Sequence, residues 1–450
     1  LAPPDHRSAR RWRLYSRHPM RWPDPVDAIP GSGALRELSR FFAATAGAHD
    51  RDGTFPFANY RALHDAGYLG RSIPQAFGGP GDAIAPLCRL QAILGQGDPS
   101  TGLAVAMHLL FMGRVGHAIV DGDVGEAGGW EADRYAHVAQ AVLREGVLVN
   151  SAATEPEIGS PSRGGRPSTR ARTLPSGEVE VTGRKTFTTG SPLLRFVVVS
   201  ATLEAPDGDP DGARMAQVMV DRGTPRFDEA GVATFDDPPG LSIIETWDAL
   251  GMRASGSHDL VLEAVRLPAG SVISAKPFGV RAPAVAPSTE VAPPPPSTSG
   301  AGWALLVPSV YLGVARAARD AAVAFARDRR PEPMGGASIG SLPSVQRTLG
   351  EIEVHLAQAE ATLFGAAEAW DAASAADRAT FAPVLAVAKH VASNQSVAVA
   401  DLAMRVVGGA GLARSHPVQR HYRDVRASLH HPPMDDVALA TLARAALTGT

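Results

Sequence analysis

The spacing of hydrophobic and polar positions changes twice along this 450-residue chain, which divides it into three parts. Up to about residue 147, apolar residues recur at helical spacing. From about residue 148, short segments rich in β-branched residues alternate with Gly, Pro, Asp and Ser, a pattern typical of antiparallel strands. From about residue 302, long alanine-rich periodic segments return, and Pro or Gly marks the breaks between them.

These patterns predict an α+β fold with an N-terminal helical domain, a middle antiparallel β-barrel or sandwich domain, and a C-terminal four-helix bundle. The boundaries that we expect are 34–147, 148–274 and 302–450, with an N-terminal extension at 1–33 and a Pro-rich linker or insertion at 275–301. The elements that we expect are helices at Ala34–Thr45, Ala58–Ala66, 85–97, 101–121, 302–329, 343–374, 380–407 and 435–448, strands at Val147–Ala153, Glu178–Thr182, Phe196–Thr202, Ala216–Asp221, Leu241–Ile244 and Asp259–Leu267, and a hairpin loop at 205–212.

Composition narrows the classes of function. Hydrophobic residues make up 44% and charged residues 20%, and the net charge of −3 gives no general attraction to nucleic acid or membranes. We expect no membrane span, because no run of about 18 uncharged apolar residues occurs. The single cysteine, Cys88, excludes an internal disulfide, and we expect a cytoplasmic protein. The Arg-rich residues 1–22 are expected to be an extension without fixed structure, with a transit-like arm as the alternative.

The densest group of titratable residues lies near the end of the chain, between Gly408 and Asp436. A long apolar helix ends at the Gly408-Gly409 pair, and Arg423-Asp424, His430-His431 and Asp435-Asp436 follow it. Loops of this composition, held between helices, often form active sites. Adjacent histidines seldom chelate one ion together, so we expect no metal. The chain contains neither a dinucleotide-binding nor a phosphate-binding glycine motif.

Four segments carry a specific resemblance. They are residues 154–160 (Thr-Glu-Pro-Glu-Ile-Gly-Ser), residues 183–190 (Gly-Arg-Lys-Thr-Phe-Thr-Thr-Gly), residues 247–255 (Trp-Asp-Ala-Leu-Gly-Met-Arg-Ala-Ser), and Gly408-Gly409 followed by Arg423-Asp424. In this order and spacing the chain resembles the acyl-CoA dehydrogenase superfamily of flavoproteins over residues 34–450. The α–β–α order predicted above agrees with that fold.

The resemblance implies a flavin site in the middle domain. Phe187 stands where the family usually has a tryptophan platform for the flavin ring, and hydroxyl groups supply donors to its edge. The residues implied are Thr154, Gly159, Ser160, Phe187, Thr188 and Thr189, with Ser160 and Arg253 also implied for the substrate. Read alone, the threonines would be ordinary strand residues.

The resemblance also implies a cofactor site that is shared between subunits, and hence a homotetramer or homodimer. Its residues are Arg330, Gln346, Arg405, Gly408 and Gly409. The guanidinium of Arg330 suits a diphosphate. FAD is the cofactor that the resemblance implies. The family's Phe-Gly after this arginine is replaced here by Pro331-Glu332, which weakens the case for an adenine half and leaves FMN possible.

The resemblance fails at the catalytic base. Acyl-CoA dehydrogenases need a carboxylate to take the substrate's α-proton, and the two positions where the family carries this glutamate hold Pro432 and Trp303 here. In the first reading the chain is still a dehydrogenase of acyl thioesters, with Asp435 or Asp436 as the base and a flavoprotein as electron acceptor. The alternative role for both aspartates is to cap the last helix.

In the second reading the chain is a two-component monooxygenase that receives reduced flavin from a flavin reductase. Such enzymes of the same fold carry a Leu-His-x-Pro stretch, which Leu429–Pro432 matches, and a histidine on the apolar helix, which His108 matches. His430 and His108 would then guide protons, although His108 also fits a core histidine. A third class is a non-catalytic flavin-binding protein. The sequence favours the dehydrogenase, because residues 251–255 look more like that branch.

Overall fold

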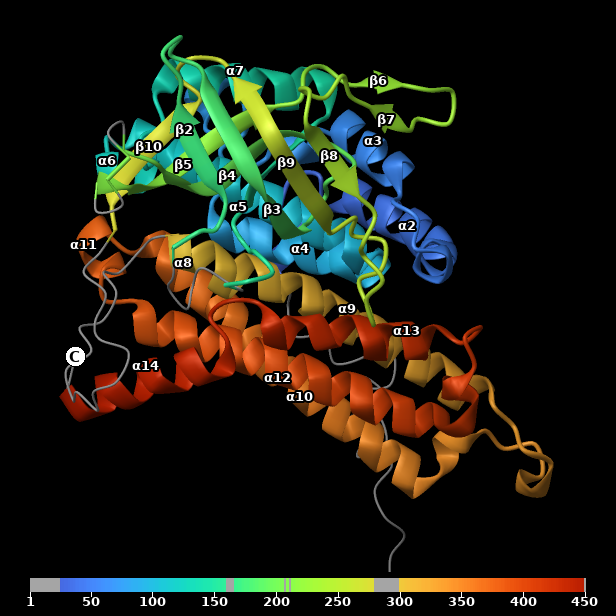
Figure 1. Ribbon diagram of the computed structural model, residues 1–450. Helices are drawn as coiled ribbons and strands as arrows, with labels where there is room; N and C mark the ends of the chain where they lie inside the picture. The colour runs from blue at the N-terminus through green and yellow to red at the C-terminus, as the bar shows by residue number, and fades with distance from the viewer. Residues whose placement is uncertain (1–24, 159–165, 206–207, 210–211, 279–298, 449–450) are drawn as a thin grey trace, which may run out of the picture.

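The computed structural model describes residues 25–158, 166–205, 208–209, 212–278 and 299–448. Figure 1 shows a β-domain above a layer of N-terminal helices, with the long C-terminal helices below. The predicted order of helical domain, β-domain and helical bundle is confirmed. Residues 1–24 and most of the Pro-rich stretch lie outside the described residues.

The N-terminal helices match the expected positions, and one further long helix appears. A helix at Ala132–Glu145 was not expected, although its apolar positions Tyr135, Val138 and Val142 are buried on one face. The helices here are α2 (Ser32–Asp52), α3 (Phe57–Asp65), α4 (Ile84–Gly97), α5 (Pro99–Val120), α6 (Val124–Ala127) and α7 (Ala132–Glu145), with short turns η1 (Pro25–Ala28), η2 (Tyr68–Gly70) and η3 (Gln75–Phe77).

The start of α5 shows how local sequence sets an element. Asp98 accepts a hydrogen bond from the backbone N–H of Ser100 and another from the hydroxyl of Thr101, and Pro99 occupies the first helical position. Asn59 of α3 also donates to Asp98, which ties the two helices together. Helix α5 is long and apolar enough to cross a membrane, but most of it is buried inside the helical domain.

The described residues of the β-domain contain every expected strand and four more. Its sheet has the order β10-β5-β4-β2-β3-β9-β8, and β1 pairs with β4. The β4–β5 pair is antiparallel across the predicted hairpin, but β1–β4 and β2–β4 are parallel, which strand spacing alone does not indicate. The strands are β1 (Leu148–Ala152), β2 (Arg170–Thr173), β3 (Val179–Thr188), β4 (Leu194–Leu203), β5 (Arg214–Asp221), β6 (Arg226–Phe227), β7 (Ala233–Thr234), β8 (Leu241–Ile244), β9 (His258–Leu267) and β10 (Val272–Pro277).

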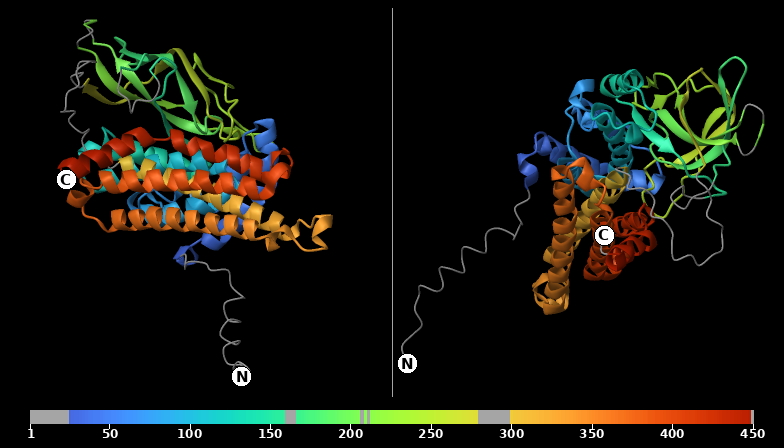
Figure 2. Two further views of the ribbon diagram at one scale, coloured as in Figure 1. Left: turned by 90° about the horizontal axis from the view of Figure 1, so that it is seen from below. Right: turned by 90° about the vertical axis from the view of Figure 1, so that its left-hand side faces the viewer.

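The C-terminal helices run alongside one another beneath the β-domain (Figure 2). The four expected helices are present, and α13 was not expected. The elements are α8 (Ser299–Ala301), a π-helical turn η6 (Gly302–Leu306), α9 (Val307–Asp328), η7 (Glu332–Met334), η8 (Ile339–Ser341), α10 (Pro343–Ala372), α11 (Ala375–Arg378), α12 (Ala382–Val407), η9 (Gly408–Leu412), α13 (Pro417–Asp424), η10 (Val425–His430) and α14 (Asp435–Thr448).

Two glycines join the bundle to the helical domain. A Cβ atom on Gly95 of α4 would lie 2.1 Å from the carbonyl oxygen of Val310, and one on Gly313 of α9 would lie 2.3 Å from that of Ala92. The two backbones can therefore approach this closely only because both residues lack a side chain. This contact fixes the position of the start of α9, which forms part of the candidate site.

Candidate active site

The exposed aromatic ring of Phe187 forms one wall of the candidate site. Phe187 lies at the end of β3, where the pairing with β9 shifts register between Lys185 and Thr188. Its φ of 56° is unusual for a residue with a bulky side chain, and its side chain is 60% exposed. The ring meets Trp247 edge-on with their centres 5.7 Å apart. Strain of this kind, which presents an aromatic face to solvent, is a common mark of a ligand site.

A chain of hydroxyl groups lies behind this ring. The Thr189 hydroxyl is 2.9 Å from that of Ser257, which is 2.7 Å from that of Ser255. Thr188 is different, because it is completely buried and its hydroxyl has no hydrogen-bond partner among the described residues. The expectation that Thr188 contacts a cofactor is therefore corrected: its side chain faces the interior of the β-domain.

The loop from Trp247 to Arg253 docks the β-domain onto the bundle. The backbone N–H of Met252 donates to Asp424 at 2.6 Å, and a Cβ on Gly251 would lie 2.5 Å from the Arg423 carbonyl oxygen. Arg423 in turn binds Asp50 of α2 through both carboxylate oxygens, at 2.9 and 2.5 Å. The Arg423-Asp424 motif therefore joins all three domains.

Arg253 is part of this joint, because its guanidinium is hydrogen-bonded within the protein. Its guanidinium donates to the Asp50 carbonyl at 2.7 Å, to the Asp248 carboxylate at 2.6 Å and to the Ala249 carbonyl at 3.0 Å. These bonds hold the loop against the end of α2. The assignment of Arg253 to a substrate is therefore corrected to a structural role.

His431 forms a second wall, beside an aromatic residue of η6 and another of α9. Its Nε2 shares a 2.6 Å hydrogen bond with the Tyr311 hydroxyl, and its ring centre lies 5.6 Å from that of Tyr311 and 6.2 Å from that of Trp303. Trp303 lies in the π-helical turn η6, a feature that often marks functional sites. The structure thus brings together both positions where the family's glutamate would stand, since Pro432 follows His431 directly.

The groups in this wall have strongly shifted pKa values. Burial, followed by the positive charges of Lys389 and His430, lowers the pKa of His431 to about 3, so its ring is neutral at ordinary pH. Burial raises the pKa of Asp424 to about 6, although Arg420 opposes this. Burial and then the charge of Asp424 raise the pKa of Tyr311. The wall is therefore an uncharged imidazole–phenol pair beside a buried carboxyl group.

The other charged residues of this stretch lie elsewhere. His430 ends η10 and is exposed, so its neighbour His431 takes the inner position that the sequence had given to His430. Asp435 begins α14 and accepts hydrogen bonds from His390 at 3.1 Å and from Asn394 at 3.0 Å. These bonds attach α14 to α12. Asp436 is exposed in the same first turn, as its capping alternative expected.

His108 is a core residue of α5. It is completely buried, its Nε2–H donates to the Leu69 carbonyl at 3.0 Å, and its Nδ1 accepts the backbone N–H of Val149 at 3.0 Å. Both ring nitrogens are therefore occupied, and burial lowers its pKa to about 4. The expected catalytic role is corrected to a structural one: His108 holds β1 against the helical domain.

A groove of about 460 Å³ lies at the far end of the bundle. It brings Gly409 beside Arg329 and Pro331, with apolar walls from Phe325, Ile339 and Val406. Arg330, Gln346, Arg405 and Gly408 are exposed nearby in the chain but do not line it, and Arg405 pairs with Asp401 at 2.9 Å. Of the five predicted residues, Gly409 alone lines the groove, and Arg329 rather than Arg330 stands beside it.

Three of the expected middle-domain residues lie beside a gap in the described chain. Thr154 is half-buried, and its carbonyl accepts the backbone N–H of Thr186 at 3.0 Å, which places it next to the Phe187 wall. Gly159 and Ser160 lie outside the described residues. Within the described ranges, no three His, Cys, Asp or Glu side chains converge as metal ligands would.

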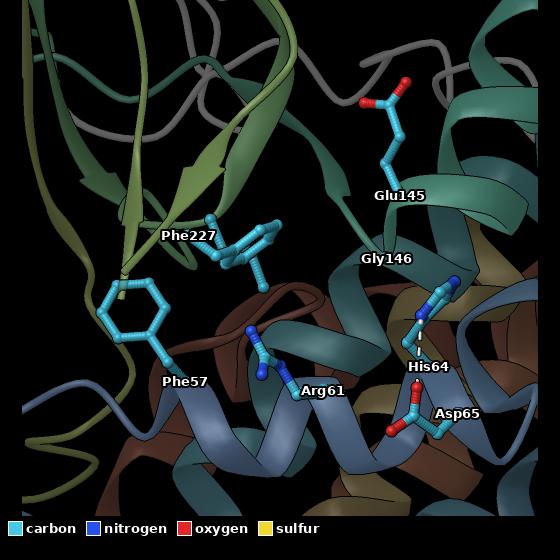
Figure 3. A pocket seen from close by; sticks show the side chains of 8 residues that line it. Phe57, Arg61, His64, Asp65, Glu145, Gly146 and Phe227 are labelled. Carbon is cyan, nitrogen blue, oxygen red and sulfur yellow. Dashed lines mark ion pairs between the residues drawn. The ribbon is translucent and has the colours of Figure 1, made fainter. Parts of the chain in front are cut away.

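A second, smaller cavity of about 300 Å³ lies away from these residues, between α3, the turn after α7 and the β6–β7 hairpin. Figure 3 shows Arg61 pointing toward Phe227, whose ring centre is 5.5 Å from the guanidinium carbon, while His64 pairs with Asp65. Glu145 is paired with Arg195 at 2.6 Å. None of the predicted site residues lines this cavity.

The order of helical domain, β-domain and helical bundle is the α–β–α fold of a class of flavoprotein oxidoreductases. Family models for the N-terminal, middle and C-terminal domains of acyl-CoA dehydrogenase match residues 34–118, 150–265 and 304–447. The chain belongs to the acyl-CoA dehydrogenase family.

Its relatives include two kinds of protein. A putative acyl-CoA dehydrogenase of Bacillus subtilis, YdbM, is 38% identical, covering 89% of this chain and 92% of its own length. The amino sugar nitrososynthase DnmZ of Streptomyces peucetius is 30% identical, covering 85% of this chain and 84% of its own. The structure of KijD3 with FMN and dTDP-3-amino-2,3,6-trideoxy-4-keto-3-methyl-D-glucose has a TM-score of 0.74 at 25% identity, covering 93% and 94% of the two chains.

Proposed function

We propose that this protein is a flavin-dependent monooxygenase that receives reduced flavin and transfers one oxygen atom from dioxygen to a small organic substrate. The second oxygen atom leaves as water. The observation that carries the proposal is the His431 wall, in which a neutral imidazole bonded to Tyr311 stands beside both positions that hold a glutamate in dehydrogenases. With its pKa lowered to about 3, the neutral ring is a weak base, but it can hold and direct a proton.

The two aspartates that a dehydrogenase would need are poorly placed to act as bases. Asp435 is occupied by His390 and Asn394, and these bonds together with the charge of His390 lower its pKa although burial opposes them. A carboxylate with a lowered pKa is a weaker base. Asp436 is exposed on the first turn of α14. His431, by contrast, lies against Trp303 and Tyr311.

The residues of the β-domain fit a flavin. Phe187 presents an exposed aromatic face that would support the ring system, and the Thr189 hydroxyl would donate to its edge. If the flavin is FAD, the groove beside Gly409 and Arg329 would hold its adenine end. When bound and reduced, the flavin supplies the two electrons that oxygen transfer requires.

We propose FMN as the flavin, with FAD as the alternative. Pro331-Glu332 replaces the family's Phe-Gly, and the exposed Arg330 donates to the carbonyl of Asp328 within its own turn. KijD3, a relative in fold, has been seen with FMN. We further propose that a flavin reductase supplies the reduced cofactor. Because DnmZ is named as an amino sugar nitrososynthase, amines are the first substrate class to test.

A second candidate is the acyl-CoA dehydrogenase reaction. YdbM, at 38% identity, carries that name, and the Gly251–Ser255 segment resembles the dehydrogenase branch. In this case oxidised flavin would take a hydride from an acyl thioester, and a flavoprotein would accept the electrons.

One experiment separates the two reactions without knowledge of the oxygenation substrate. The protein reconstituted with oxidised flavin is mixed without oxygen with acyl-CoAs of short, medium and long chain, and the visible flavin absorbance is followed. Separate anaerobic titrations compare the affinities for reduced and oxidised FMN. The proposal expects no bleaching and tighter binding of reduced FMN. Bleaching by any acyl-CoA would instead establish the dehydrogenase.

We also propose that the chain forms a homotetramer or homodimer. Apolar residues of the long bundle helices are exposed in the single chain, including Val354 of α10 and Val384 and Val387 of α12, which are 56%, 41% and 38% exposed. Burial of such residues against another copy would be favourable. The groove beside Gly409 lies at the exposed end of the same bundle, which suits a cofactor shared between subunits.

A further inference from the structure

The cavity of about 300 Å³ beside α3 is separate from the walls formed by Phe187 and His431. One side of it comes from α3, which contributes Phe57 and Arg61, and another comes from Phe227 of β6. Figure 3 shows Arg61 directed toward Phe227. The cavity therefore lies between the helical domain and the β-domain, where side chains from both could contact one ligand.

The guanidinium of Arg61 is the group that distinguishes this cavity. Its carbon lies 5.5 Å from the centre of the Phe227 ring, and it forms no ion pair with a carboxylate of the described residues. By contrast, Arg222 and Arg226 in the same part of the β-domain each bind an aspartate. A guanidinium has five N–H donors in a planar fork that matches a carboxylate. The donors of Arg61 are therefore available to a bound anion.

The two acidic residues that line the cavity already have basic neighbours. Glu145 accepts hydrogen bonds from Arg195 through both of its carboxylate oxygens, at 2.7 and 2.6 Å. The Asp65 carboxylate lies 3.8 Å from the ring of His64. Among the charged side chains that line this cavity, Arg61 is thus the one without a counter-ion in the described part of the chain.

Two aromatic rings accompany this charge. Phe57 precedes Arg61 by one turn of α3, so both side chains lie on the same face of the helix. Phe227 is 42% exposed, which leaves part of its ring open to a ligand. Ligand pockets usually enclose roughly 300–1,000 Å³, and this cavity is at the lower end of that range. It therefore suits a molecule with a single ring better than a nucleotide or a coenzyme A thioester.

We propose that this cavity binds a small aromatic carboxylate, whose charged group accepts hydrogen bonds from Arg61 while its ring packs against Phe57 and Phe227. Paired N–H donors of one guanidinium recognise a carboxylate with defined geometry. Aromatic side chains give a flat ring favourable stacked or edge-on contacts. Because the site shares no residue with the Phe187 and His431 walls, the inference does not depend on the proposed reaction.

The test measures binding of benzoate to the full-length protein by ligand-detected NMR titration. Benzyl alcohol, which has the ring without the charge, and inorganic phosphate, which has the charge without the ring, are titrated in the same way. Arg61→Gln removes the guanidinium, and Arg40→Gln is its control, because Arg40 is exposed on α2 and does not line the cavity. Phe227→Leu removes one ring, and Phe41→Leu is its control, because Phe41 is 55% exposed on α2.

We expect benzoate to bind saturably, with one molecule per chain. Its affinity should fall about 10- to 100-fold in Arg61→Gln, because a hydrogen-bonded charge pair is lost, and about 2- to 10-fold in Phe227→Leu, because an aromatic contact is lost. Neither control variant should change the affinity. Benzyl alcohol and phosphate should each bind about 10-fold more weakly than benzoate or worse.

Three results would overturn the proposal: no saturable binding of benzoate, wild-type affinity in Arg61→Gln, or binding of benzyl alcohol or phosphate as tight as that of benzoate. Loss of binding in Phe187→Leu but not in Arg61→Gln would place benzoate at the flavin wall and would also contradict it. If Arg61→Gln does not fold, the comparison of benzoate with benzyl alcohol in the wild type still decides whether the charge is recognised. These titrations need no flavin, so their outcome leaves the monooxygenase proposal to its own test.

Discussion

At the scale of single residues, the sequence predicted which segments form the site better than which side chains face it. The motif at 183–190 led to Phe187, which is exposed near the end of β3, but also to Thr188, which is completely buried, and to Thr189, which is mostly buried beside Ser257. From the His430-His431 pair the sequence predicted His430, but His430 is exposed and His431 contacts the aromatic residues. The backbone at the end of η10 decides which ring points inward, and the sequence alone does not show this. Arg253 and His108 carry chemistry that suits a ligand, yet hydrogen bonds to the backbone occupy both.

Thr189 and Thr188 provide a matched pair for the flavin wall. We expect Thr189→Val to weaken flavin binding by about 2- to 10-fold, since a typical hydrogen bond contributes about 0.5–1.5 kcal/mol. Thr188→Val should leave the affinity unchanged, because its hydroxyl is buried and has no partner within the described chain. Fluorescence titration with FMN measures both. Equal loss in the two variants would remove Thr189 from the flavin site.

Glu155 and Lys185 form a completely buried pair that predicts the behaviour of the β-domain in acid. Burial raises the pKa of Glu155, but hydrogen bonds from Lys185, Ser168 and Thr169 outweigh it and lower the pKa from 4.5 to about 2. The unfolded state therefore binds more protons, and the pair stabilises the fold fully above about pH 4.5 and loses this effect as the pH falls toward 2.

We accordingly expect urea stability to fall between pH 4.5 and 2 in the wild type and to change less over this range in a Glu155→Gln variant. At neutral pH that variant should be about 3–5 kcal/mol less stable, because it leaves Lys185 buried without its partner charge. Equilibrium unfolding at a series of pH values measures both effects. Parallel pH curves for the two proteins would contradict this assignment.

At the scale of elements, the period of the hydrophobic pattern predicted the long helices and most strands. It did not predict the parallel pairing of β1 with β4, because pairing is decided by which strands meet in space rather than by spacing along the chain. The π-helical turn at Trp303 and the helix α13 were also not predicted. Helix α13 is short and mostly polar, so its place is set by Arg423 and Asp424 rather than by an apolar face.

A substitution at His108 tests how helix α5 is attached to β1. We expect His108→Leu to destabilise the protein by about 2–5 kcal/mol, because the Leu69 carbonyl and the Val149 N–H each lose a buried partner. Flavin affinity of the folded fraction should stay close to that of the wild type. Urea unfolding and an FMN titration measure the two quantities. A stable variant that cannot bind or use flavin would return His108 to the active site.

At the scale of the whole molecule, three domains meet at the Arg423-Asp424 joint, and the candidate site lies on both sides of it. The sequence indicated the architecture because the spacing of hydrophobic residues changes at each domain boundary, from helical to strand spacing and back again. The reaction could not be predicted in the same way, since it depends on which groups stand opposite the flavin wall. The structure groups His431, Trp303 and Tyr311 as a neutral aromatic set, which the hydrophobic pattern does not reveal.

The state of assembly follows from the exposed faces of the bundle. We expect analytical ultracentrifugation to show a multiple of the 46.9 kDa chain mass. The double variant Val384→Asp, Val387→Asp should shift the protein toward the monomer, because it would bury charge in the contact. Val232→Asp changes a similarly exposed valine in the β-domain and should leave the assembly intact. A wild-type monomer would contradict a cofactor site shared between subunits.

The most direct measurement of the proposed reaction follows the oxygen atom itself. The protein is supplied with a flavin reductase, reduced FMN and ¹⁸O₂ in the presence of a panel of amines, and products are examined by mass spectrometry. We predict one ¹⁸O atom in the product, a loss of about 10²-fold in turnover in His431→Asn, and little change in His430→Asn. A product without ¹⁸O, or full activity in His431→Asn, would contradict a monooxygenase site built around His431.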